Sequence, residues 1–293
     1  AGVLGLALEE LTEGQSQIRV LVDLGTYFAP LAKVITVGSS GSDYKTINKA
    51  LDSINDGSTS LTASNSAQNR YLIKVAPGVY EEQIVMKDYV DIVGDGAGLV
   101  TIQSDQSPVV TFSAHARLEG VTIKSISEAA EPVLVSISGG SPILQDLNFS
   151  AETENQAVGI SISGEPVKVS LNKLTFNSNY SQAIVNLAST TVSIMHSDLS
   201  GIIGAAFVAQ NGFIKSYFNI YNGVFGDMAI AAGVRFESIG DNYSQVSNSG
   251  IFLDKTNRGK VDSDYIDYGW LTEADLAFGS DASVQALKVK VSS

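Results

Sequence analysis

The side chains of this sequence that could do chemistry are mainly carboxylates, and the densest group lies near the C-terminal end. Asp262, Asp264 and Asp267 fall close together there. Carboxylates at such spacing could bind Ca²⁺ or form the acid pair of a glycan-cleaving enzyme. The group lacks the regular ligand spacing of a Ca²⁺-binding loop. We therefore interpret it as a solvated acidic edge and predict no metal site.

Aromatic side chains are concentrated in the same C-terminal third of the chain. Rings offer apolar platforms for sugars, so this enrichment could mark a glycan-binding face. The same rings could equally stack in a core or form contacts between three chains. The candidates for glycan contact are Tyr217, Tyr221, Tyr265, Tyr268 and Trp270.

Composition excludes several classes of function. The chain has 293 residues, a formal net charge of −13 from 18 basic and 31 acidic residues, two His and no Cys. Without clustered Lys and Arg, binding to nucleic-acid phosphates or to anionic membranes is not expected. The lack of Cys excludes disulfides and thiolate metal sites, and two histidines alone cannot build a multi-His site. We predict no cofactor, no nucleic-acid partner and, without an apolar run of about 20 residues, no membrane insertion.

The N-terminal segment has a different pattern from the rest of the chain. Its apolar residues recur at alternating intervals of four and three, as in the seam of a coiled coil. Three heptads are marginal as a free helix, so partner chains or the body of the protein must support them. The segment is either a helix that caps a core or a short oligomerising stalk, and we predict a helical oligomerisation segment over residues 1–33. The seam comprises Leu4, Leu8, Leu11, Gln15, Ile18 and Val22.

From Val34 onward, short β-type runs separated by Gly, Asn, Asp and Ser dominate the sequence. One amphipathic helix interrupts them, because Ile47, Ala50, Leu51 and Ile54 share a helical face. An apolar pattern then recurs, with a degenerate copy near residue 236 and starts 26, 27, 23 and 19 residues apart at Leu118, Leu144, Leu171, Ile194 and Phe213.

A period close to two dozen residues, with about three short strands in each unit, indicates the turns of a parallel β-solenoid. In such a fold each turn buries its apolar side chains against the next turn. We therefore predict an all-β, right-handed parallel β-helix over residues 34–293, with one capping helix near its start and a cap at its C-terminal end.

Part of this region resembles the pectinesterase-type right-handed β-helix, a pectin-lyase-like fold. The resemblance is carried by the segment Ile35–Leu51, by Gly78, Tyr80 and Glu82 at Gly-x-Tyr-x-Glu positions, and by Val90–Gly96. It covers about residues 34–104. It implies a fold and not an activity, because the chemistry of that family resides in later segments.

Those later segments have only partial counterparts in this chain. The nearest fragments are Gln145-Asp146-Leu147 and Val224-Phe225-Gly226-Asp227, and an Arg-Pro-Trp segment is missing. The two aspartates are 81 residues apart, more than three predicted turns, which is too far for both to flank one ester carbon. We assign no catalytic residue. If the chain were an enzyme, its carboxylates would come from Asp146, Asp227, Asp262, Asp264 and Asp267.

Together these features predict a non-enzymatic structural or adhesive protein. A helical stalk ahead of a β-helix resembles bacteriophage tail fibres and spikes, so we expect a homotrimeric fibre, spike or decoration protein that contacts other virion or cell-surface proteins and can bind host-surface glycan. Its expected location is a virion or the cell exterior. One alternative is a carbohydrate-active enzyme, an esterase or a glycan lyase or hydrolase with a groove along the solenoid. Another is a secreted bacterial adhesin that binds glycan without cleaving it.

Overall fold

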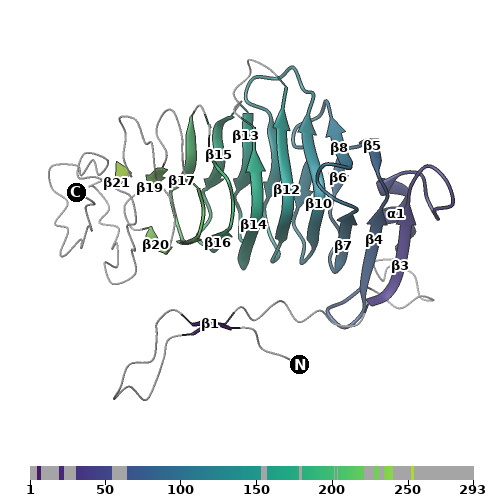
Figure 1. Cartoon of the computed structure of the whole chain (residues 1–293), viewed down its shortest axis with the longest axis horizontal. Helices are drawn as coiled ribbons and strands as arrows, with labels where there is room; N and C mark the ends of the chain where they lie inside the picture. Colours follow the sequence, from purple (N-terminus) through teal and green to yellow (C-terminus); the bar gives the residue numbers. More distant parts are fainter. Residues whose placement is uncertain are drawn as a thin grey trace.

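In a computed structural model of the chain, residues 31–54, 65–152, 157–177, 180–200, 202 and 204–220 are described, together with the short stretches 5–7, 20–22, 228–230, 234–239 and 252–253. The body of the protein is a parallel β-solenoid whose turns follow one another along the long axis of the molecule (Figure 1). Parallel strands joined by crossovers take a right-handed course, and the predicted right-handed parallel β-helix is confirmed.

Two parallel sheets run along the solenoid. The larger one, sheet 1, has the order β20-β18-β16-β14-β12-β10-β7-β4-β3, and β5 and β8 join it beside β10. Its strands are β3 (Leu31–Val37), β4 (Arg70–Val75), β5 (Gly78–Glu81), β7 (Val90–Gly94), β8 (Val100–Ser104), β10 (Arg117–Ser125), β12 (Ile143–Ala151), β14 (Lys168–Phe176), β16 (Thr191–Met195), β18 (Phe213–Tyr217) and β20 (Arg235–Ile239).

The second sheet, sheet 2, has eight strands in the order β21-β19-β17-β15-β13-β11-β9-β6. In both sheets each strand pairs with the equivalent strand one turn away, so every described turn hydrogen-bonds to its neighbours. The strands of sheet 2 are β6 (Ile84–Val85), β9 (Val110–Phe112), β11 (Val133–Ile137), β13 (Ala157–Ile162), β15 (Tyr180–Asn186), β17 (Ala205–Ala209), β19 (Met228–Ile230) and β21 (Phe252–Leu253).

The strand register confirms most of the predicted repeat and corrects one copy. Leu118 pairs with Leu144, Leu144 with Leu171, and Leu171 with Ile194. Ile194 pairs with Ser216 and not with the predicted start, Phe213, so the interval of 19 was too short by three residues. The sequence search was misled because Ser216, a small polar residue, occupies the position that Leu or Ile holds in the earlier turns.

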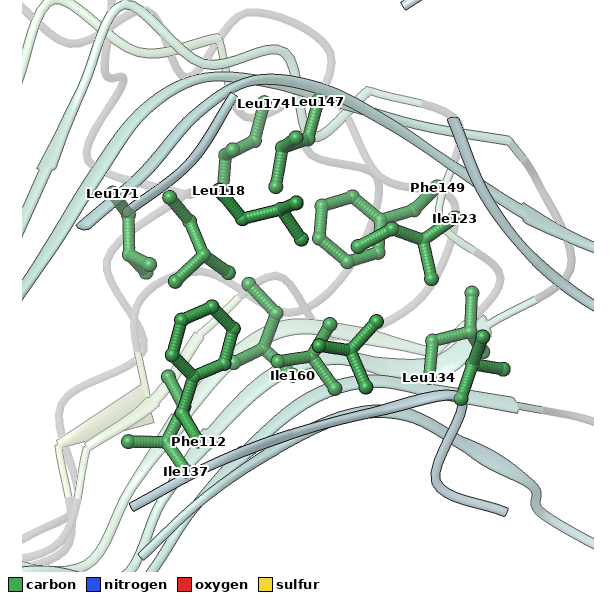
Figure 2. Packing of buried hydrophobic residues seen from close by; sticks show 14 of the residues in the cluster. Phe112, Leu118, Ile123, Leu134, Ile137, Leu147, Phe149, Ile160, Leu171 and Leu174 are labelled. Carbon is green, nitrogen blue, oxygen red and sulfur yellow. The ribbon is translucent and has the colours of Figure 1, made fainter. Parts of the chain in front are cut away.

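The core lies between the two sheets. Leu118, Leu147 and Phe149 of sheet 1 face Phe112 and Ile160 of sheet 2, and all five are buried (Figure 2). Rings also stack from turn to turn, since the centroids of Phe149 and Phe176 lie 4.5 Å apart. Within one turn, Tyr180 meets Phe176 edge-on. One continuous apolar interior thus runs through the described turns.

Sheet 1 bends once in each of five successive turns, at a residue with positive φ. Gly120, Asp146, Lys173, His196 and Phe218 have φ values of 68°, 51°, 53°, 50° and 56°, and they occupy equivalent places in successive turns. We call them the bend column. A Cβ on Gly120 would lie 2.6 Å from the carbonyl oxygen of Gly94, so glycine is required where these two turns touch. In the later turns L-residues hold the same bend against the preference of their backbone.

The first turn is closed by α1 (Ile47–Ser53), which buries Ile47, Ala50 and Leu51 and is the predicted capping helix. Both carboxylate oxygens of Glu82 accept hydrogen bonds of 2.8 Å from the first amides of α1, those of Ile47 and Asn48. This explains the last position of the Gly-x-Tyr-x-Glu motif, since a carboxylate there satisfies amides that the helix cannot pair itself.

The middle of that motif also has a structural role. The Tyr80 hydroxyl donates a 2.8 Å hydrogen bond to the carbonyl of Ala76, and burial, followed by the charges of Glu82 and Asp95, raises the pKa of the phenol. Tyr80 and Glu82 of the motif therefore help to build the start of the solenoid.

The predicted N-terminal helix is wrong for two stretches. β1 (Gly5–Ala7) and β2 (Val20–Val22) are strands that pair antiparallel, so a continuous helix does not run through them. Val22 of the predicted seam lies in β2, where Val-Leu-Val favours an extended backbone. The other seam positions, Leu4, Leu8, Leu11, Gln15 and Ile18, lie outside the described residues. The described part of the chain contains no helix that is long and apolar enough to cross a membrane.

Adjacent residues of β14 test the alternation of inward and outward side chains. Leu174 is buried and Thr175 is exposed. We expect Leu174→Ala to lower the free energy of unfolding by about 2–5 kcal/mol, because it leaves a cavity between two turns, and Thr175→Ala to change it by less than about 0.5 kcal/mol. Urea unfolding followed by circular dichroism measures both variants, and equal losses would contradict the assignment of faces.

Candidate functional site

Two of the residues proposed from the sequence as site residues lie in the described part of the chain. Asp146 is an exposed member of the bend column in β12, and Tyr217 is half-buried at the end of β18. Gln145, the neighbour of Asp146, is linked by register through Asn172 and Met195 to Tyr217. Asp146 and Tyr217 are thus three turns, or about 14 Å, apart along the axis. The remaining candidates, Tyr221, Asp227, Asp262, Asp264, Tyr265, Asp267, Tyr268 and Trp270, lie outside the described residues.

The neighbours of Asp146 in the bend column do not supply a second acid. Gly120 occupies the equivalent position one turn earlier, and Lys173 occupies it one turn later. Further along, the rings of His196 and Phe218 stack with their centroids 5.6 Å apart. Within the described turns, this column therefore places Asp146 beside a cation and not beside the second carboxylate that glycoside cleavage needs.

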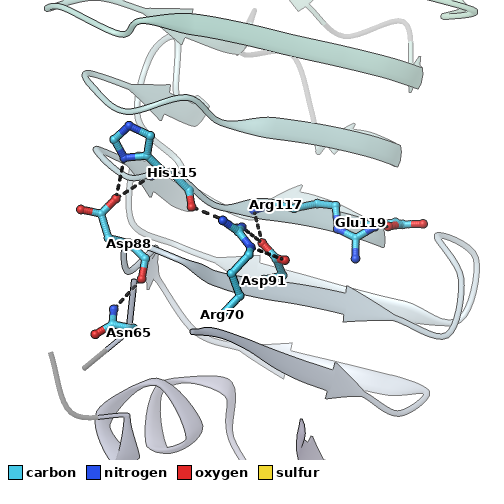
Figure 3. Close-up of polar contacts among 7 residues, drawn as sticks. All are labelled: Asn65, Arg70, Asp88, Asp91, His115, Arg117 and Glu119. Carbon is cyan, nitrogen blue, oxygen red and sulfur yellow. Dashed lines mark hydrogen bonds and ion pairs between the residues drawn. The ribbon is translucent and has the colours of Figure 1, made fainter. Parts of the chain in front are cut away.

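The most extensive group of charged contacts among the described residues was not predicted from the sequence. It joins Arg70 of β4, Asp91 of β7 and Arg117 of β10, with Asp88 and His115 in the segments that lead into those strands (Figure 3). We call these five residues the first-turn cluster. Arg70 and Asp91 are 21 residues apart, and Asp91 and Arg117 are 26 apart, so each step along the chain is close to one turn. Extending the turn count back before Leu118 could have found the cluster.

Asp91 is the centre of the cluster and is fully buried, although its side chain leaves the outer side of β7. Its Oδ1 lies 2.5 Å from Nη2 of Arg70, and its Oδ2 accepts a second hydrogen bond, of 3.2 Å, from Nε of the same guanidinium. The backbone amide of Arg117 donates a third hydrogen bond, of 2.9 Å, to Oδ1. The carboxylate is enclosed and hydrogen-bonded on both oxygens, so it links three successive turns of the solenoid.

Asp88 and His115 form the accessible edge of the cluster. Asp88 Oδ1 accepts a 2.7 Å hydrogen bond from the backbone amide of His115 and lies 3.0 Å from Nδ1 of its ring. Burial raises the pKa of Asp88, but these two hydrogen bonds and the charges of His115 and Arg70 outweigh it, so the pKa lies below the ordinary 3.8. The His115 ring stacks on Tyr89, whose other neighbour is the Arg70 guanidinium, 5.7 Å from the ring centroid.

A histidine paired with a carboxylate could move a proton. Here, however, the pair and the residues around it link neighbouring turns of the solenoid. Arg117 and Glu119, which extend the cluster along β10, form an ion pair of 2.5 Å with each other (Figure 3). Among the described residues, no group of three or more His, Asp or Glu side chains is placed to hold a metal ion.

Comparison with known proteins finds no matching protein family and no match among curated proteins. Several solved pectin methylesterases have a similar structure. Pectin methylesterase PemA from Erwinia chrysanthemi is 11% identical, with a TM-score of 0.42 over 78% of this chain and 93% of that chain. The deglycosylated enzyme from Aspergillus niger is 16% identical, with a TM-score of 0.45 over 89% and 90%, and the carrot enzyme is 13% identical, with a TM-score of 0.40 over 76% and 88%.

A double-mutant cycle on Arg70 and Asp91 tests the structural role of the buried pair. We expect Arg70→Ala to lower the free energy of unfolding by about 3–5 kcal/mol, because it leaves Asp91 charged and enclosed without a counter-ion. The double variant Arg70→Ala/Asp91→Ala should lose less than the sum of the single variants. Urea unfolding at pH 7 gives the four values, and strict additivity would show that the two side chains do not act as a pair.

The lowered pKa of Asp88 predicts an acid-dependent contribution to stability. Because the folded-state value is below the unfolded one, the contribution is complete above the unfolded pKa and is lost as pH falls through the folded pKa. Wild type should therefore exceed Asp88→Asn in stability at pH 6, by less than about 1 kcal/mol at this half-exposed site, and the difference should shrink as the pH falls below the ordinary pKa of 3.8. Unfolding curves from pH 2 to pH 6 measure it, and a constant difference would refute the proposed origin.

Proposed function

We propose that this protein is a non-enzymatic structural or adhesive β-helix, assembled as a homotrimeric fibre, spike or decoration protein of a bacteriophage virion and able to bind host-surface glycan. The observation that carries the proposal is the way in which its charged side chains are paired. In the described turns several of them bind a partner one turn away, as Arg70 binds Asp91 and as Lys124 of β10 binds Glu152 beyond β12. Side chains fixed in this way stiffen a rod.

The surroundings of Asp146 favour this proposal over the enzymatic alternative. An esterase or glycosidase needs convergent groups around one reacting carbon. Asp146 has Gly120 and Lys173 as its column neighbours, and the buried Asp91 is already bound by Arg70 and the amide of Arg117. In the described part of the chain, the carboxylates that are paired with a cation therefore stabilise the fold.

The oligomeric part of the proposal rests on the sequence. The pairing of Gly5–Ala7 with Val20–Val22 replaces the predicted coiled coil, and the apolar residues Leu8 and Leu11, which lie between those strands in the sequence, are the candidates for contact between chains. A place in a virion or at the cell exterior, with virion or cell-surface proteins as partners, belongs to the same proposal.

The mass of the protein in solution tests the assembly. We expect light scattering after size exclusion to give three times the chain mass of 30.8 kDa at micromolar concentration, and Leu8→Asp/Leu11→Asp to reduce it, because charges placed in apolar contacts between chains are not tolerated. A monomer in the wild-type protein would overturn the fibre proposal.

An assay for ester and glycosidic cleavage separates the enzymatic alternative. Methyl-esterified polygalacturonate should release neither methanol nor shorter saccharides in the presence of the wild-type chain. Release that is abolished by Asp146→Asn and kept by the exposed variant Thr175→Ala, outside the bend column, would replace the structural proposal with an esterase or lyase.

A further inference from the structure

The outer surface of sheet 2 differs in chemistry from the rest of the solenoid. Its outward side chains stand in three columns, set by the strand register and by the hydrogen bonds that follow each strand. None of these side chains from β9 to β17 is ionisable, and one turn earlier, beside β6, Lys87 continues the third column. The columns are Val133, Val158, Gln182 and Ala205; Thr111, Ser136, Ser161, Val185 and Val208; and Ser113, Ser138, Ser163, Leu187 and Gln210. All of these are at least partly exposed except Val185, which is buried.

Large apolar side chains lie exposed on the same surface. Val85 of β6, which continues the middle column, is 58% exposed, and Leu187 at the end of β15 is 41% exposed. At its two borders stand the exposed acids Glu131 and Glu165. An uncharged centre of Val, Leu, Ser and Thr with a charged border is the composition found in the middle and rim of protein interfaces.

Sheet 1 presents the opposite pattern over the same turns. Its outward side chains include Arg117, Glu119, Lys124, Lys168 and Lys173. In a chain with a formal net charge of −13, two copies repel each other at most contacts. The centre of the sheet 2 surface, between these acidic borders, lets copies approach without setting like charges against one another.

We infer that the outer face of sheet 2, from β6 to β17, is the surface by which the chain binds a second copy of itself. Within each column the side chains repeat at the one-turn spacing. The side chains of an identical or similar sheet can therefore fit between them, as in stacked sheets about 10 Å apart. The six strands span about 24 Å along the axis and about 20 Å across. Two such faces together bury about 1,000 Å², the lower limit for a specific interface.

The inference rests on the proposed function in one respect, because both require copies of the chain to assemble. They differ in what they predict of the assembly. A face stacked on itself pairs two copies, whereas a three-fold arrangement sets it against another face of the neighbour. The experiment therefore measures the number of chains and the surface they use separately.

Charge placed on the surface is the first test. Ser136→Glu and Ser161→Glu should weaken assembly about tenfold or more, because like charges then meet in the contact. Ser170→Glu makes the same substitution at a partly exposed position of β14 in sheet 1, and should leave assembly unchanged. Analytical ultracentrifugation over a dilution series gives the association constants, and circular dichroism verifies that each variant is folded.

Cysteine labelling is a second measurement that does not depend on a disruptive change. The chain has no Cys, so Ser161→Cys and the control Ser170→Cys each carry one thiol. We expect a maleimide to label Ser161→Cys slowly at high protein concentration and faster after dilution, and to label Ser170→Cys at one rate throughout.

The outcomes separate the inference from the proposed function. A dimer that Ser136→Glu dissociates would support this surface and overturn the trimer. A trimer that Ser136→Glu dissociates would support both the surface and the proposed function. A trimer whose association is unchanged by Ser136→Glu and by Ser161→Glu would overturn the inference alone. A wild-type monomer would overturn both the inference and the proposed function. A monomer that still protects Ser161→Cys would mean that another part of the same chain covers the face.

Discussion

The structure depends on the in-register stacking of one turn on the next. Parallel backbone hydrogen bonds hold equivalent residues about 4.8 Å apart, so each inward side chain packs against its counterpart above and below. The column Leu118, Leu144, Leu171 and Ile194 shows the rule, and Ser216 shows what an exception requires. The buried hydroxyl of Ser216 accepts a 2.9 Å hydrogen bond from Asn219, whose side chain also binds the amide of Ser197 and the carbonyl of Ile194. A polar residue is tolerated in the stack because Asn219 of the same turn satisfies it and is itself held by the preceding turn.

This constraint explains which features could be predicted from the sequence. Stacked turns need apolar residues at a nearly constant interval, and that interval is visible in the chain without knowledge of its path. The capping helix was equally accessible, since Ile47, Ala50 and Leu51 form its buried face. The register of the turn after Ile194 was not, because Ser216 removed the apolar marker and Phe213, paired in fact with Thr191, offered a false one.

The first-turn cluster could not be found by looking for motifs, because its members come from three turns. Arg70, Asp91 and Arg117 meet only after the backbone has wound twice, and each looks like an ordinary strand residue in its own segment. Similarly, heptad spacing from Leu4 to Val22 carries no information about pairing between Gly5–Ala7 and Val20–Val22, which joins residues about fifteen apart. Contacts between distant segments were thus predictable only where the repeat itself specified them.

The same stacking decides what the outside of the solenoid can do. Every outward column is a row of side chains at one-turn intervals, so a catalytic centre needs particular residues in adjacent turns and adjacent columns. The bend column changes chemistry at each step, from Gly120 through Asp146, Lys173 and His196 to Phe218, and so offers no repeated ligand array. The columns of sheet 2 stay uncharged from β9 to β17, with Thr111, Ser136 and Ser161 in succession and then Val185 and Val208. A surface that repeats in this way is matched best by another surface whose rows have the same spacing. A second copy of the solenoid has that spacing because its turns stack at the same interval.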